Sequence, residues 1–404
     1  MNRTLKHPVL TLLTQLPVGQ LRLTLPSGET SVFGRDAQAM CAEIVIHDAV
    51  VLDAVRKSGD IGFAESYRAG HWTSPNVVAL LRLMIANREA LERMIYGSWW
   101  GSLLYRIQYA FKRNSRTGSQ KNIHAHYDIG NDFYKLWLDA GMSYSSAWYG
   151  GLPDNSPSDA LMLGDAQNAK MARALHQIDA TKDLRIAEIG CGWGALAEMA
   201  VTRYGAQIDG ITLSDEQLAW GLARMNRQKI DQAAHLMRLD YRDLPQRAKP
   251  APYDAIVSIE MFEAVGQQYW AGFFEAVFDS LKKGGKACIQ TITIRDDLFA
   301  KYEKGTDFIQ QYIFPGGFLP CDTAFKSAAK AAGLVVTDAF AFGQDYARTL
   351  AVWRSNFMAQ SQAVRELGFD THFIRLWEFY LAYCEAAFAE GSTNVVQYTL
   401  ERPL

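Results

Sequence analysis

The segment at residues 185–194 constrains the fold more than any other part of the chain. It reads Arg-Ile-Ala-Glu-Ile-Gly-Cys-Gly-Trp-Gly, an apolar run short enough for a buried strand that ends in three glycines. Residues 195–204 then have the apolar spacing of a helix. Because Gly190, Gly192 and Gly194 carry no Cβ, backbone N–H groups of the turn can closely approach a ligand at the carboxyl end of the strand.

The spacing of these glycines favours one class of ligand. G-x-G-x-G differs from the dinucleotide fingerprint at the third glycine, and no Lys-Ser or Lys-Thr pair follows it. A pyrophosphate or triphosphate is therefore less expected than an adenosine compound with an uncharged tail. A purely structural role for the glycine turn stays open at this point.

The composition is that of a globular protein and argues against several other classes. The chain has 404 residues, long enough for two domains, with 49% hydrophobic and 21% charged residues. The 41 basic and 43 acidic residues argue against a dedicated nucleic-acid binder. Five cysteines without C-x-x-C spacing, and no signal-peptide pattern, predict a cytoplasmic protein with reduced thiols and no metal site. The apolar stretches are shorter than the roughly 18 residues of a membrane span, so we expect at most peripheral contact with a bilayer.

Residues 1–111 are expected to form a separate small α+β module. Residues 19–26 alternate as a strand does, and Ser27-Gly is typical of a turn. Residues 39–57 have spacings compatible with a strand followed by a helix.

Three segments in this module allow two interpretations: the apolar residues 77–85 and the aromatic-containing residues 94–100 and 103–111. The first is a helical core. The second is a surface that inserts into a bilayer, assisted by the basic linker at residues 112–121, which we take as the domain boundary. The basic residues are Lys112, Arg113, Arg116 and Lys121.

The remainder of the chain, residues 122–404, alternates strand and helix patterns, which predicts an α/β fold with a doubly wound sheet. The clearest expected strands are residues 186–189, 207–211, 255–259 and 286–292, with helices beginning near Gln217, Trp270 and Phe325.

Polar residues follow two further expected strands. Thr212 ends the second strand, with Gln217 a turn later, where a hydrogen-bonding group can reach a ribose; the commoner choice is a carboxylate, and Asp209 is nearby. Asp240 and Tyr241 follow the third strand and suit the exocyclic amine and ring face of an adenine. The alternative for Asp240 is a helix N-cap or turn.

Eight motifs in this order resemble the cyclopropane fatty acid synthase family of S-adenosylmethionine-dependent methyltransferases. The resemblance extends from about residue 122 to the end of the chain, and residues 59–70 also resemble the lipid-engaging domain of the longer bacterial synthases. The motifs are residues 124–134, 142–147, 190–194, 212–217, 240–242, 258–266, 312–317 and 342–346.

The resemblance implies a seven-stranded, Rossmann-like methyltransferase domain preceded by a lipid-engaging domain. Such enzymes methylate the cis double bond of an acyl chain, commonly in a membrane phospholipid. We therefore expect S-adenosylmethionine as cofactor, peripheral contact with the inner face of the membrane, no nucleic-acid partner and, from the family, a homodimer.

The same resemblance assigns the site residues. Those expected to bind the cofactor are Tyr144, Ser145, Glu188, Gly190, Gly192, Gly194, Thr212, Leu213, Gln217, Asp240 and Tyr241. Those expected at the reaction centre are Tyr127, Ser146, Glu263, Gln290, Ile292 and Tyr346.

The expected reaction centre departs from the family pattern. In the family, a bicarbonate held by Cys, Glu, His and Tyr accepts the proton from the carbocation that methyl transfer creates. Glu263 and Tyr346 match, but Ser146 stands at the Cys position and Gln290 at the His position, and Ala264 replaces a further His. Serine and glutamine still donate hydrogen bonds, so a bound bicarbonate is compatible with these changes, although no imidazole is left to carry charge.

These departures suggest an altered product. Without a well-held base at the transferred methyl group, a neighbouring acyl carbon would lose the proton, which yields a methyl-branched unsaturated or methylene chain in place of a ring. Three alternatives stay open: an ordinary cyclopropane synthase, a small-molecule methyltransferase and a lipid-binding protein without catalysis. The intact cofactor motifs weigh against the last of these.

Overall fold

The computed structural model describes residues 7–36, 40–91, 129–151 and 159–404. The chain forms two compact units: unit 1 contains residues 1–111, 300–315 and 353–392, and unit 2 contains residues 112–299, 316–352 and 393–404. The two later segments of unit 1, which we expected in the methyltransferase domain, group instead with the amino-terminal region.

Unit 1 contains a four-stranded sheet in the order β2-β1-β3-β4. Its strands are β1 (Gln20–Thr24), β2 (Thr30–Phe33), β3 (Cys41–Ile46) and β4 (Trp72–Thr73). The expected strand at residues 19–26 and the strand-then-helix pattern at residues 39–57 are confirmed. The alternation buries Leu21 and Leu23 on one face of β1, which gives this sheet its packed side.

The helices of unit 1 come from distant parts of the chain. They are α1 (Pro8–Leu13), α2 (Val50–Arg68), α3 (Val77–Ala86), α14 (Phe308–Tyr312), α17 (Ser361–Glu366) and α18 (Thr371–Ala389). Helix α18 packs against α2 and α3. Trp72, which is fully buried, stacks on Phe63 and meets the ring of Phe379 on α18. For residues 77–85 the structure therefore confirms the helical-core interpretation; residues 94–100 and 103–111 lie outside the described residues.

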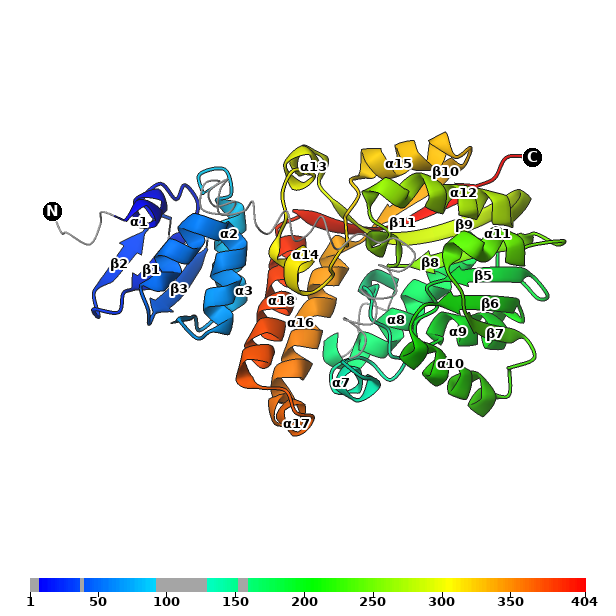
Figure 1. The fold of residues 1–404 in the computed structure, drawn as a ribbon, viewed down its shortest axis with the longest axis horizontal. Coiled ribbons are helices and arrows are strands. Elements are labelled where there is room, and N and C mark those ends of the chain that lie inside the picture. The colour runs from blue at the N-terminus through cyan, green and yellow to red at the C-terminus, as the bar shows by residue number, and fades with distance from the viewer. Residues whose placement is uncertain (1–6, 37–39, 92–128, 152–158) are drawn as a thin grey trace. The chain divides into compact units, whose positions relative to one another are not determined.

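Unit 2 contains the expected doubly wound sheet, with seven strands in the order β10-β11-β9-β8-β5-β6-β7 (Figure 1). The strands are β5 (Arg185–Ile189), β6 (Gln207–Thr212), β7 (Ala234–Arg238), β8 (Tyr253–Ile259), β9 (Leu281–Ile294), β10 (Val335–Ala341) and β11 (Thr393–Glu401). Strands β5 to β9 run parallel, and β11 is antiparallel to both of its neighbours. The connection order reverses between β5 and β8, and ligands of such sheets bind at the carboxyl ends of the strands at that point.

Helices cover both faces of this sheet. Figure 1 shows α9 (Ala195–Tyr204) and α10 (Asp215–Gln228) on one side of the strands, and α12 (Trp270–Ser280) and α15 (Asp322–Ala331) on the other. The other helices are α7 (Asn131–Lys135), α8 (Asp159–Gln177), α11 (Leu244–Arg247), α13 (Asp296–Tyr302) and α16 (Gly343–Ala359), the last continuing from unit 2 into unit 1. Within the described ranges, no helix combines the length and the apolar character needed to cross a bilayer.

Candidate active site

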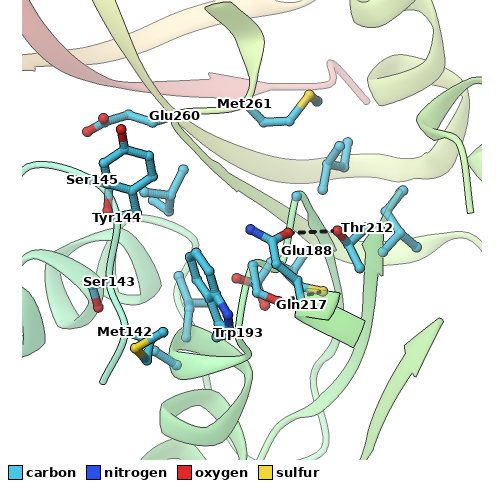
Figure 2. A pocket seen from close by; sticks show the side chains of 18 of the residues that line it. Met142, Ser143, Tyr144, Ser145, Glu188, Trp193, Thr212, Gln217, Glu260 and Met261 are labelled. Carbon is cyan, nitrogen blue, oxygen red and sulfur yellow. Dashed lines mark hydrogen bonds between the residues drawn. The ribbon is translucent and has the colours of Figure 1, made fainter. Parts of the chain in front are cut away.

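A pocket in unit 2 opens at the carboxyl ends of β5 and β8, where the connection order reverses. It is lined by the glycine turn, by residues 142–145, by the end of β6 and by the segment that follows β8 (Figure 2). Of the residues expected at the cofactor, it brings together Tyr144, Ser145, Glu188, Gly190, Gly192, Thr212, Leu213, Gln217 and Tyr241. The sequence motifs therefore meet in one place although they are far apart in the chain.

Each of the three positions in the turn requires glycine for a different structural reason. All have positive φ angles, of 83°, 51° and 84° for Gly190, Gly192 and Gly194. A Cβ on Gly190 would lie 2.9 Å from the Met261 side chain, and one on Gly194 would lie 3.0 Å from that of Met225. A Cβ on Gly192 would meet no protein atom within 4 Å. Gly192 thus leaves space open beside the pocket, whereas Gly194 does not line the pocket and is needed for packing.

Glu188, at the end of β5, carries a buried and incompletely bonded carboxyl group. The residue is 3% exposed, and its Oε2 atom has no hydrogen-bond partner among the described residues. Burial raises its pKa to about 8, against the nearby positive charges of Lys170 and Arg224. A buried carboxyl oxygen without a partner beside the glycine turn is suited to a polar group of a ligand.

Lys170 on α8 was not among the expected residues, but it lines the same pocket. Its Nζ atom donates to Ser145 Oγ over 2.5 Å, and burial lowers the pKa of its ammonium group to about 8. Glu260, Asp139 and Glu188 are the acidic groups that oppose this effect. A lone helical lysine had no signal in the sequence that distinguished it from a surface residue.

The polar residues at the tip of β6 hold one another in place. Thr212 donates from its hydroxyl to Gln217 Oε1 over 3.0 Å, as Figure 2 shows, and Gln217 N donates to Ser214 Oγ, the N-cap of α10. Asp209 lies outside the pocket: it accepts from Tyr253 Oη over 2.7 Å and pairs with Arg185.

Asp240 has the helix-capping role that the sequence left open as an alternative to cofactor binding. It caps the short helix at Tyr241–Asp243 by accepting from Arg242 N, and it forms an ion pair with the Arg242 guanidinium. It is absent from the pocket lining, whereas Tyr241 is present. A cap and a ligand contact both favour aspartate after a strand, so the residue type could not distinguish them.

The residues expected to hold bicarbonate converge on a protein carboxylate. Ser146 N and Gln290 Nε2 donate to Glu260 Oε1 over 2.8 Å and 2.7 Å, and Tyr346 Oη donates to Glu260 Oε2 over 2.6 Å. The Ser146 hydroxyl, from which we expected the hydrogen bond, donates instead to the carbonyl oxygen of Ala147. Glu260 was not among the predicted site residues.

The other residues expected at the reaction centre lie beside this cluster or outside the described chain. Ile292 N donates to the Glu263 carboxyl group. Burial and the neighbouring Glu260 raise the pKa of Glu263 to about 8. Tyr127 lies outside the described residues. One signal in the sequence pointed to Glu260, namely an acidic residue directly after the strand that is paired with the glycine-turn strand.

The fold and the pocket define an S-adenosylmethionine-dependent methyltransferase, and comparisons with known proteins agree. A sequence model of the mycolic acid cyclopropane synthetase family matches residues 114–398. The chain belongs to that family.

Two relatives cover most of the chain. The chain is 35% identical over 396 residues to tuberculostearic acid methyltransferase UfaA1 of Mycobacterium tuberculosis, covering 96% of this chain and 88% of the relative. It is 29% identical over 362 residues to the cyclopropane-fatty-acyl-phospholipid synthase of Escherichia coli, covering 89% and 88%. A solved structure of mycolic acid cyclopropane synthase CmaA1 complexed with SAH and CTAB matches 70% of this chain and 97% of that one, with 28% identity and a TM-score of 0.62.

The residues present fit S-adenosylmethionine as the cofactor. The open space at Gly192 leaves room for a ligand next to the turn, and the unpartnered Glu188 Oε2 offers a hydrogen-bonding group. No phosphate-binding lysine follows the glycines. The adenosine compound with an uncharged tail that the spacing favoured is thus compatible with both observations.

Proposed function

We propose that this enzyme methylates the cis double bond of an unsaturated acyl chain in a membrane phospholipid and releases a methyl-branched unsaturated or methylene chain in place of a cyclopropane. The observation that carries the proposal is the convergence of Ser146, Gln290 and Tyr346 on Glu260. The Gln290 and Tyr346 side-chain donors expected for a bicarbonate, together with the backbone N–H of Ser146, are engaged by a carboxylate that belongs to the chain.

The relatives support the substrate class. One is named a cyclopropane-fatty-acyl-phospholipid synthase, and another a tuberculostearic acid methyltransferase, a name that specifies methyl transfer and no ring. Both matches extend into residues 1–111 of unit 1, whereas the family match begins at residue 114. We assign unit 1 the engagement of lipid at the cytoplasmic face of the membrane.

The chain's own residues have two tasks at this pocket: they hold the cofactor and they keep water out. S-adenosylmethionine supplies an electrophilic methyl group when it is bound. Tyr144, Ser145, Glu188 and Gln217 would hold it, with Gly192 leaving the necessary room. The apolar side chains at the pocket, such as Met261 and Ile259, would keep water from the cation that forms on the acyl chain.

Deuterium labelling tests the product. Purified enzyme is given trideuteromethyl S-adenosylmethionine and vesicles of a phospholipid with cis-unsaturated chains, and the lipid is analysed by mass spectrometry and proton NMR. A branched internal alkene keeps three deuterons, whereas a ring and a methylene group each keep two. Proton NMR separates these last two products, because only the ring has cyclopropyl protons. A ring as the only product would identify an ordinary cyclopropane synthase. Methylation of free acyl chains alone would contradict the phospholipid assignment.

A further inference from the structure

Glu260 has a backbone conformation that is unfavourable for its residue type. Its φ angle is 48°, in the left-handed region, where a non-glycine residue costs about 1 kcal/mol or more. The residue follows β8 directly, and its N–H donates to the carbonyl oxygen of Gln290 over 2.8 Å. A glutamate in this conformation requires a compensating interaction, and its side chain provides one.

The carboxylate of Glu260 receives hydrogen bonds from three separate segments. Ser146 lies in the segment before α8, Gln290 on β9 and Tyr346 on α16. Donor-to-acceptor distances of 2.6–2.8 Å are those of hydrogen bonds to an ionised group. The arrangement is therefore a preformed cradle for one carboxylate, and Glu260 lines the pocket beside Tyr144 and Ser145 (Figure 2).

The orientation of the Gln290 amide follows from its neighbours. Arg173 can only donate, and its Nη1 atom lies 2.7 Å from Gln397 Oε1. Gln397 Nε2 therefore faces Gln290 Oε1, at 3.0 Å, and Gln290 Nε2 is left to donate to Glu260. The hydrogen bonds that begin at Arg173 therefore orient Gln290 so that its NH2 group, and not its carbonyl oxygen, faces the Glu260 carboxylate.

The charges around Glu260 allow it to gain and lose a proton. Burial raises the pKa of its carboxyl group, while Lys170 and the three hydrogen-bond donors lower it. The nearby Glu263 carboxyl group has its pKa raised to about 8, so it is mostly protonated at neutral pH and adds little negative charge. An ionised carboxylate of increased basicity is suited to general base catalysis.

We propose that the Glu260 carboxylate is the general base of this enzyme, in place of a bound bicarbonate. The inference rests on the proposed function and names the group that completes it. Ser146, Gln290 and Tyr346 are then positioning residues for Glu260, and the reaction needs no second small molecule.

The proposed reaction conserves atoms and charge. The π electrons of the acyl double bond form a bond to the methyl carbon, and the sulfonium sulfur keeps the electrons of the bond that breaks. A carbocation remains on the acyl chain. For a branched internal alkene, Glu260 takes a proton from an acyl carbon next to the cationic carbon, and the electrons of that C–H bond form the new double bond. For a methylene chain, a hydride first moves from the methyl-bearing carbon to the cationic carbon, and Glu260 then takes a proton from the transferred methyl group. The products are S-adenosylhomocysteine, the methylated chain and one proton, which leaves the carboxyl group afterwards.

Removal of bicarbonate is the first test. We expect the wild-type rate to be the same, within about twofold, in buffer freed of carbon dioxide and in the same buffer with bicarbonate restored. Glu260→Gln, which keeps size and hydrogen-bonding capacity without basicity, should lower the rate by about 100-fold or more. Cofactor affinity by calorimetry should be retained. The matched control Glu275→Gln removes an exposed carboxylate from α12 and should leave the rate unchanged.

Glu260→Gly is the second test, because it relieves the backbone strain and vacates the cradle. We expect ¹³C-labelled bicarbonate to bind this variant but not the wild type by NMR, and added bicarbonate to restore its activity by about tenfold or more. Bicarbonate dependence of the wild type would overturn the inference. So would near-normal activity of Glu260→Gln, or a Glu260→Gly variant that binds cofactor but is neither occupied nor rescued by bicarbonate.

Failure of the inference is distinguishable from failure of the proposed function. The labelled product of the wild type tests the proposed function alone, whereas the bicarbonate dependence and the Glu260 variants test the identity of the base. A wild type that makes a ring without bicarbonate, and loses activity in Glu260→Gln, would keep Glu260 as the base and change only the product.

Discussion

At the scale of the residue, Gly192 is a position where packing within the protein does not exclude a side chain, so a ligand accounts for the open space. Its φ of 51° strains any other residue, but a Cβ there would contact no protein atom. The glycine spacing was enough to predict the turn and its ligand class. It could not show that Gly190 and Gly194 face Met261 and Met225, because contacts between distant segments leave no trace in local spacing.

We expect Gly192→Ala to lower cofactor affinity by about tenfold or more and the free energy of unfolding by only about 1 kcal/mol. The added methyl group takes the space beside the turn, while the protein loses no packing. Calorimetric titration with S-adenosylmethionine and thermal unfolding measure the two effects. Gly272→Ala, on α12 with no positive φ and no atom near its Cβ, is the control and should retain affinity. An unchanged affinity in Gly192→Ala would contradict the placement of the cofactor.

At the scale of the element, β9 and β11 position the reaction centre. Gln290 and Gln397 lie directly opposite each other in the antiparallel pair. The sequence predicted β9 as residues 286–292, shorter than the observed Leu281–Ile294, and did not single out β11. Six consecutive residues of β11 are buried, so the two-residue alternation that identifies a half-exposed strand is missing. The cradle for Glu260 was therefore not predictable from local pattern.

We expect Gln397→Glu to lower the rate of methyl transfer by about tenfold while cofactor affinity stays within about twofold. Glutamate still accepts from Arg173 but, when ionised, has no donor for Gln290 Oε1, so the Gln290 amide loses its fixed orientation against Glu260. Steady-state kinetics and calorimetry on the same preparation check both expectations. Equal rates for the variant and the wild type would mean that the amide chain does not orient the carboxylate.

At the scale of the whole molecule, each unit is assembled from separate stretches of chain. The strand and helix patterns predicted the doubly wound sheet. They could not assign residues 300–315 and 353–392 to unit 1, because that assignment depends on contacts such as those of α18 with α2 and α3. One such contact is polar: Asp60, next to the non-helical Gly59 inside α2, accepts from Tyr383 Oη on α18 over 3.0 Å.

We expect the stability of unit 1 to fall as pH rises from about 4 to about 7.5. Burial and Asp307 raise the pKa of Asp60 to about 7, and burial raises that of Asp307 to about 6. The folded state therefore holds protons that the unfolded state releases at lower pH, at up to about 1.4 kcal/mol for each pKa unit. Asp60→Asn removes one of these groups and should reduce the slope.

Hydrogen exchange of peptides from residues 50–68, followed across this pH range in urea, measures the effect. Asp279→Asn, an exposed residue on α12, is the matched control and should keep the wild-type slope. If Asp60→Asn also keeps the wild-type slope of stability against pH, or if stability rises with pH, Asp60 does not hold a proton in the folded state.

The position of β11 in the chain also determines when the enzyme becomes active during its synthesis. Gln397 follows Gln290 by 107 residues in the chain, yet β11 pairs directly with β9 as an interior strand between β9 and β10. Because a nascent chain emerges from the ribosome with its amino end first, β9 and the glycine turn are free to fold before β11 has left the exit tunnel. Until then the Gln290 amide has no partner to orient it, so a ribosome-bound chain should bind the methyl donor before it can use it.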